Sequence, residues 1–344
     1  MEQQASPMPD LPQKRRGKTA LIAGGIGAIA LIAGYFILQG QIAENAENEI
    51  ARFLRSTDLD RDIRYRYIEA SLFGQSVTLR NVRLNLGDAS GTIEAVTISN
   101  YDLDERSGHL NSIDIHLEGT DFPIQASRSM WLKIQTPMPY LIGVDAVRGN
   151  IGIEYQYDNV DGNLDTRINF DLPDLVDGDF EVSLGGIHLP PVDKISSPDF
   201  ATLGRMFEAS GKADLHSVSL KLTDQGVEDA IAEYVSVENG AALDGPAYRE
   251  KMQQILETRL EKSPPRSPFE RHLADVAQDA LKSSGGTVSI AYEPQFPTPF
   301  EDIGSGALNL MLGGFGTFGQ QAFQNRETLN DLFESEVLQI TFDS

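Results

Sequence analysis

The sequence predicts an α+β protein: an N-terminal transmembrane helix, then a meandering, curled antiparallel β-sheet, with C-terminal amphipathic helices packed on one face or end of the sheet. Three observations support this fold class. Twenty residues from Thr19 to Leu38 carry no charge, much of 63–223 alternates apolar and polar residues, and 225–283 has helical periodicity. We expect a disordered cytoplasmic tail at 1–18, a transmembrane helix at 19–39, a mainly β extracytoplasmic region at 40–224, and a helical segment with closing strands at 225–344, in the same domain or closely packed with it.

The uncharged run near the start is long enough to cross a bilayer. At about 1.5 Å per residue it spans about 30 Å, whereas the apolar region of a signal peptide usually has about 7–15 residues. No small-x-small cleavage site directly follows it, and it has no polar face of the kind that a core helix shows. We therefore expect an uncleaved anchor rather than a cleaved signal or a buried core helix. Its apolar side chains are Leu21, Ile22, Ile26, Ile29, Leu31, Ile32, Phe36, Ile37 and Leu38.

The flanks of this run predict its orientation and a packing surface. A basic cluster precedes the run, and the first residues after it are acidic, so the positive-inside rule places the N-terminus in the cytoplasm and the main domain outside. The basic residues are Lys14, Arg15, Arg16 and Lys18. Ala20, Gly24 and Ala28 recur at four-residue spacing, which would let a second helix approach closely.

The middle of the chain has the pattern of consecutive strands. Val77 and Leu79 follow one phase of alternation and Val82 and Leu84 the other, which predicts a bulge near Arg80–Asn81. An Asp161–Gly162 pair between two alternating runs predicts a hairpin. Further strands are expected in 91–103, 112–119, 129–135, 144–157, 163–172, 179–189 and 212–223.

Helical periodicity follows in 225–238, 246–262 and 268–283, and the proline-rich stretch 263–268 separates the last two. In 246–262 the apolar stripe consists of Met252, Ile255, Leu256 and Leu260. Strand patterns return in 285–294 and at 336–343. Strands followed by helices are typical of the α+β class.

Composition excludes several functions. The chain has 28 basic and 51 acidic residues and a net charge of −23, which disfavours binding to nucleic acid. It has no cysteine, so thiol nucleophiles and cysteine metal sites are excluded. The nucleophile and phosphate-binding motifs GxSxG, SxxK and the P-loop do not occur.

Two patterns have a chemical interpretation and a plainer one. His116 shares a predicted strand face with Asp114 and Glu118, which could hold a metal, but the same alternation describes a solvated polar face, and we prefer that interpretation. Gly314, Gly316 and Gly319 match GxGxxG. An exported compartment lacks the usual nucleotide pool, so we interpret this stretch as a glycine–phenylalanine loop. We therefore expect no enzyme, no catalytic residue, no cofactor and no metal.

The expected N-terminal anchor is followed by YIEASLFGQSVTLRNVRL, and LTDQGVEDAIAEY and SSGGTVSIAYEPQFPTPFEDI occur further along. In these stretches the chain resembles the AsmA-like group of bacterial envelope proteins and related single-anchor periplasmic families of unknown function. The resemblance implies a single-pass protein of the bacterial inner membrane whose curled sheet lies in the periplasm. Larger members of the group are associated with moving or sorting lipids between membranes.

These observations together predict a periplasmic protein of envelope maintenance that contacts the bilayer through its N-terminal helix. Its curled sheet would bind a lipid or another apolar ligand. The alternative is a structural or scaffold subunit of an inner-membrane complex, with a membrane-protein partner and no ligand. The sequence leaves open whether the apolar sheet face is a groove or a filled core.

Overall fold

The computed structural model describes residues 51, 54–55, 60–71, 76–85, 90–104, 106–123, 146–189, 191, 213–230, 232, 244–299 and 331–344. The strands are β1 (Ile63–Arg64), β2 (Tyr67–Ser71), β3 (Ser76–Asn85), β4 (Ser90–Leu103), β5 (Leu110–Pro123), β6 (Ala146–Asp158), β7 (Asn163–Leu172), β8 (Val176–Gly185), β9 (Asp214–Asp224), β10 (Thr287–Tyr292), β11 (Thr298–Pro299) and β12 (Leu338–Asp343). Helices α8 (Gly245–Lys262) and α9 (Pro268–Ala280) lie between β9 and β10 in the chain.

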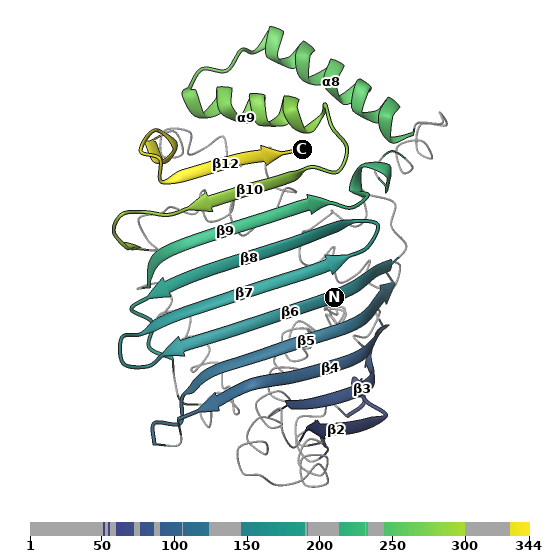
Figure 1. Cartoon of the computed structure of the whole chain (residues 1–344), viewed down its shortest axis with the longest axis vertical. Helices are drawn as coiled ribbons and strands as arrows, with labels where there is room; N and C mark the ends of the chain where they lie inside the picture. The colour runs from purple at the N-terminus through teal and green to yellow at the C-terminus, as the bar shows by residue number, and fades with distance from the viewer. Residues whose placement is uncertain are drawn as a thin grey trace, which may run out of the picture.

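All described strands belong to one sheet of twelve strands, in the order β1-β3-β4-β5-β6-β7-β8-β9-β10-β12. β2 also pairs with β3, and β11 pairs with β9. Every pairing is antiparallel, and the strands run across the short dimension of the molecule while the sheet extends along its length (Figure 1). Chain neighbours are mostly sheet neighbours, as expected when connections are short.

The helices stand at one end of the sheet, beyond β12 (Figure 1). Phe269 and Leu273 of α9 pack against Leu338 and Ile340 of β12 in a common apolar cluster. The His272 ring of α9 bonds the carbonyl oxygen of Ile340. A strand at the edge of a sheet exposes unpaired backbone groups, so α9 shields this edge from further strand pairing.

The fold class predicted from the sequence is wrong and requires correction. Within the described ranges the chain is mainly antiparallel sheet, and its helices are few and mostly C-terminal. None of the helices in the described ranges is long and apolar enough to cross a membrane. The described residues therefore give no support to the expected single-pass membrane protein. The predicted span at 19–39 lies outside the described residues.

The two local predictions for the strands have different outcomes. The hairpin at Asp161–Gly162 is confirmed, because β6 and β7 pair directly on either side of it. The prediction of a bulge near Arg80–Asn81 is wrong, because the register between β3 and β4 continues without a shift past this point. Asn81 does have an unusual backbone conformation, with a positive φ of 53°.

The alternation of buried and exposed side chains instead changes phase in β3, β4 and β5 together. It does so at Asn81, Glu94 and Gly119, which lie side by side on the three strands and form a line across the sheet. On β4, Ala95 and Val96 are both buried, so the change occurs there too. The line ends at a register shift between β5 and β6. There Gly119, with a φ of 60°, donates its N–H to Asn150 Oδ1 at 3.0 Å. Because all three strands change phase at one place, their apolar residues stay on one face.

Two separate clusters of buried residues hold the sheet. The first is built on β1, β3, β4 and β5, and it includes Ile63, Val77, Leu79, Ile93 and Ile98. The second joins β9, β10 and β12 to α9, and it includes Leu215, Tyr292, Leu338 and Phe269. The apolar side chains of β6 and β7 lie between the two.

Candidate functional site

A continuous row of apolar side chains crosses nine strands of the sheet. Residues directly opposite one another in an antiparallel pair point to the same face, so the strand register defines the row. It runs through Val77, Ile98, Ile115, Ile153, Ile168, Phe180, Leu220, Ile290 and Ile340. A parallel row beside it contains Leu79, Val96, Leu117, Ile151, Phe170, Gly178, Leu222, Val288 and Phe342.

Burial along the first row is uneven. At one end Val77 and Ile98 are 1% and 0% exposed, and at the other Ile290 and Ile340 are 5% and 3% exposed. The side chains between them, on β5 to β9, are only half-buried. We call this half-buried part of the two rows the apolar band: Ile115, Leu117, Ile151, Ile153, Ile168, Phe170, Phe180 and Leu220.

A glycine on β8 lets one aromatic ring of the apolar band pack closely on the sheet. The ring of Phe170 on β7 occupies the space over Gly178 on β8, where a Cβ atom would overlap it. Beside the band, burial raises the pKa of the Tyr155 phenol, with a smaller contribution from Tyr157. The side chains of the band carry no charge.

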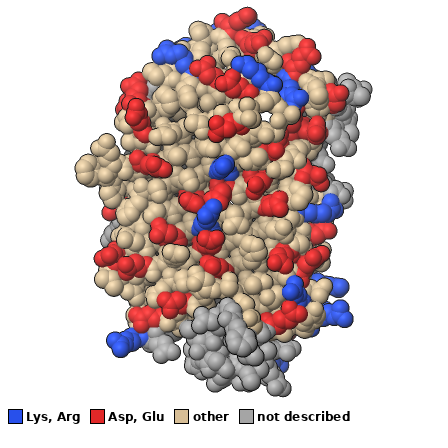
Figure 2. All heavy atoms as spheres, in the orientation of Figure 1, with Lys and Arg blue, Asp and Glu red and all other residues tan. Residues whose placement is uncertain are grey.

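The opposite face of the sheet is charged. Figure 2 shows acidic side chains spread across it, with few basic ones in the centre. On this face Arg167 of β7 bonds Asp179 of β8 at 2.6 Å and lies 3.3 Å from Glu181. The Asp179 carboxylate raises the pKa of Arg167, first through this hydrogen bond.

His116, Asp114 and Glu118 also lie on this face, where they line a shallow hollow of about 260 Å³ with Glu154. Across the described ranges, no group of three or more histidine and acidic side chains is placed to hold a metal ion. The GxGxxG glycines lie outside the described residues.

A serine, a histidine and an aspartate come together in the β4–β5 loop, but not as a catalytic triad. Ser107 Oγ donates to Asp104 Oδ2 at 2.6 Å, and this bond is the largest cause of the lowered pKa of Asp104. The His109 ring bonds the carbonyl of Leu189 instead, through Nε2 at 2.9 Å. A triad requires the histidine to receive the serine proton. Asn159 donates to Ser107 Oγ at 3.1 Å, so the cluster joins this loop to the β6–β7 hairpin.

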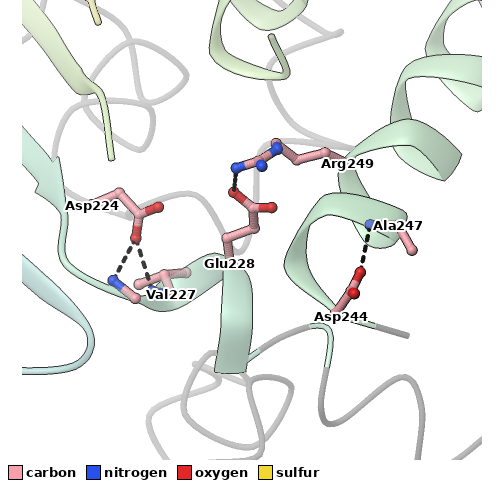
Figure 3. Close-up of polar contacts among 7 residues, drawn as sticks. Asp224, Val227, Glu228, Asp244, Ala247 and Arg249 are labelled. Carbon is pink, nitrogen blue, oxygen red and sulfur yellow. Dashed lines mark hydrogen bonds and ion pairs between the residues drawn. The ribbon is translucent and has the colours of Figure 1, made fainter. Parts of the chain in front are cut away.

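A shielded ion pair fastens α8 to the segment after β9 (Figure 3). Arg249 Nη1 lies 2.7 Å from Glu228 Oε2, and the two side chains are 21% and 16% exposed. Burial raises the pKa of Glu228, although the neighbouring Arg249 opposes this shift. Asp224 Oδ1 accepts from the N–H groups of Gly226 and Val227, which orients the same segment.

The site residues predicted for the N-terminal segment lie outside the described residues, from Lys14 to Leu38. Within each strand, alternation alone places Ile151 with Ile153, and Ile168 with Phe170, on the same face. It could not show which of them are opposite each other on neighbouring strands. That information is contained in the register, which the sequence does not specify for strands joined by irregular loops.

Comparison with known proteins adds little on function. Residues 169–312 are similar to a family model described only as an uncharacterized protein, and this span is shorter than half of the chain. It begins within β7 and includes β8, β9, both helices and β10. No curated protein matches the sequence. The resemblance to AsmA-like proteins stays a prediction.

Proposed function

We propose that this protein binds an acyl chain of a lipid along the apolar band. The observation that carries the proposal is the uneven burial of one apolar row. The row is continuous over nine strands, its two ends are fully buried, and its middle is half-buried. A contiguous apolar strip that stays partly accessible to solvent is a candidate binding surface.

The dimensions and chemistry of the band support a chain-like ligand. From β5 to β9 the row covers four strand spacings, or about 19 Å at about 4.8 Å each. Half of a bilayer core is about 15 Å thick, so the band accommodates one acyl chain at full length. The described band side chains carry no charge, and each apolar side chain that a ligand covers contributes on the order of 1.5 kcal/mol.

The scaffold alternative has less support from the surface of the sheet. Cores of protein interfaces are depleted in charged residues. The charged face seen in Figure 2 carries many acidic side chains. By strand register, Asp114, Glu154 and Glu181 belong to this face. This face is therefore a poor surface for docking a second protein.

The test uses the full-length protein and a fluorescent fatty acid. Ile153→Asn and Ile168→Asn place a polar amide in the band and should each weaken binding roughly tenfold. Gln156→Glu lies on the other face of β6 and serves as the matched control, with unchanged affinity expected. Thermal unfolding of each variant checks that the sheet is intact. Equal binding by all three variants and the wild type, or no binding at all, would overturn the proposal.

A further inference from the structure

A second hollow lies at the ends of the first strands and has arginine side chains on its wall. Its volume is about 610 Å³, and residues from β1, β3, β4 and β5 line it. Arg61, Arg64 and Arg83 are among the lining residues, as are Ser90 and Thr92. On the face shown in Figure 2, a group of basic side chains gathers at the lower right, beside the first strands.

The strand register places two of these arginines against each other. Arg64 of β1 is directly opposite Arg83 of β3. The row continues from Arg83 to Thr92, then to Asp121 and Arg148. Directly opposed residues have Cβ atoms about 4.5–5.5 Å apart, and like charges in this arrangement destabilise the pair.

The wall of the hollow carries more arginines than acids that could neutralise them. Asp121 Oδ2 lies 3.5 Å from Arg148 Nε, so these two charges offset each other. Asp62 is the other acid on the wall. Within the described part of the chain, Arg61, Arg64 and Arg83 are in no ion pair. The hollow is therefore locally positive in a chain whose net charge is −23.

We propose that this hollow binds a phosphate-class oxyanion between Arg64 and Arg83, with Arg61 as a third cation. Guanidinium groups bind phosphate through paired, charge-assisted hydrogen bonds. The Ser90 and Thr92 hydroxyls can donate to the remaining oxygens. A bound dianion changes the repulsion between Arg64 and Arg83 into attraction to a common partner. The anion is either a free phosphate or the phosphate of a lipid headgroup.

This inference does not depend on the acyl-chain proposal. Arg64 and Arg83 lie on the charged face of the sheet, next to Ile63 and Leu84, which are buried in the first cluster. The apolar band lies on the opposite face and further along the sheet. Either site can fail its test without affecting the other.

The test measures binding to the full-length protein and to three variants. Calorimetric titration uses inorganic phosphate at constant ionic strength, and flotation uses phosphatidylcholine vesicles with and without phosphatidic acid. Arg64→Gln and Arg83→Gln should each weaken binding roughly tenfold, since a charge-assisted hydrogen bond is lost. Arg167→Gln removes an arginine of the same face that is already paired with Asp179, and it should bind as the wild type does.

Thermal unfolding without ligand gives an independent readout. Arg64→Gln should raise the melting temperature because it removes a positive charge directly opposite Arg83, while abolishing the further rise that the anion produces. Saturable binding of inorganic phosphate supports a site for free anions. Binding only to vesicles that contain phosphatidic acid supports a headgroup site, provided that the two hollow variants lose it. The proposal is overturned if neither probe binds, or if Arg64→Gln and Arg83→Gln bind as tightly as Arg167→Gln.

Discussion

The ring of Phe170 and the missing side chain of Gly178 form a complementary pair across β7 and β8. The backbone of Gly178 does not have a positive φ, so what this position requires is space rather than conformational freedom. The sequence shows a glycine within a strand, but its partner becomes known only with the register.

Gly178→Ala should therefore lower the free energy of unfolding by about 1–3 kcal/mol, because the new methyl group overlaps the Phe170 ring. Urea denaturation measures this change. In a Phe170→Leu background the same substitution should cost less, since the smaller side chain leaves room for the methyl group. An equal cost in both backgrounds would disprove the steric explanation.

The surroundings of Glu228 should make the stability of the protein depend on pH. Burial raises the pKa of Glu228 above the ordinary value of 4.5, so the folded state binds more protons than the unfolded state in the interval between these two values. The free energy of unfolding should consequently fall as pH rises through that interval. Glu228→Gln should flatten this part of the pH profile in urea denaturation. Glu250→Gln, which removes an exposed acid of α8, should leave the profile unchanged; a wild-type slope in Glu228→Gln would contradict the assignment.

At the scale of elements, the two helices have similar N-termini and different surroundings. Asp244 caps α8 by accepting from the N–H of Ala247, and Ser267 caps α9 by accepting from the N–H of Glu270. The α9 helix packs its apolar stripe into the second cluster. The stripe predicted on α8 is only partly covered: Ile255 is 39% exposed, and Met252, Leu256 and Leu260 are half-buried. Gly245 is the buried residue of this helix.

Removal of the two caps should therefore have different effects. Ser267→Ala should lower the global free energy of unfolding by about 1 kcal/mol, because α9 is part of the core. Asp244→Ala should increase hydrogen exchange within α8 and leave global stability almost unchanged. Equal global losses would show that α8 is more strongly coupled to the sheet than its burial indicates.

Local patterns were sufficient to predict most strands, the β6–β7 hairpin and the positions of both helices. Alternation shows which residues share a face, and a proline or a cap shows where a helix begins. These patterns do not show how much of a face is covered, so the apolar stripe of α8 was overestimated. They also do not show which residues on neighbouring strands oppose each other, so neither the apolar band nor the position of Arg64 opposite Arg83 was predicted.

At the scale of the whole molecule, two buried clusters occupy opposite parts of one sheet. The half-buried strands β6 and β7 connect them through backbone hydrogen bonds and few buried side chains. A substitution that destabilises one cluster should consequently leave the stability of the other cluster unchanged.

Leu338→Ala removes a side chain from the second cluster and should accelerate hydrogen exchange in β10, β12 and α9, with β3 and β4 unaffected. Ile98→Ala should accelerate hydrogen exchange in β3 and β4 and leave β10, β12 and α9 unaffected. Each substitution should cost about 2–5 kcal/mol within its own part of the sheet. Uniform acceleration across the sheet in either variant would show that the molecule opens as one unit.

The line through Asn81, Glu94 and Gly119 restricts how this protein can evolve. If a deletion removed Asn81 alone, Val77 and Leu79 would turn toward water, whereas β4 and β5 would keep their orientation. Insertions and deletions in these strands are therefore tolerated only when all three change together. Across its descendants, β3, β4 and β5 should retain a common length while their surface residues diverge freely.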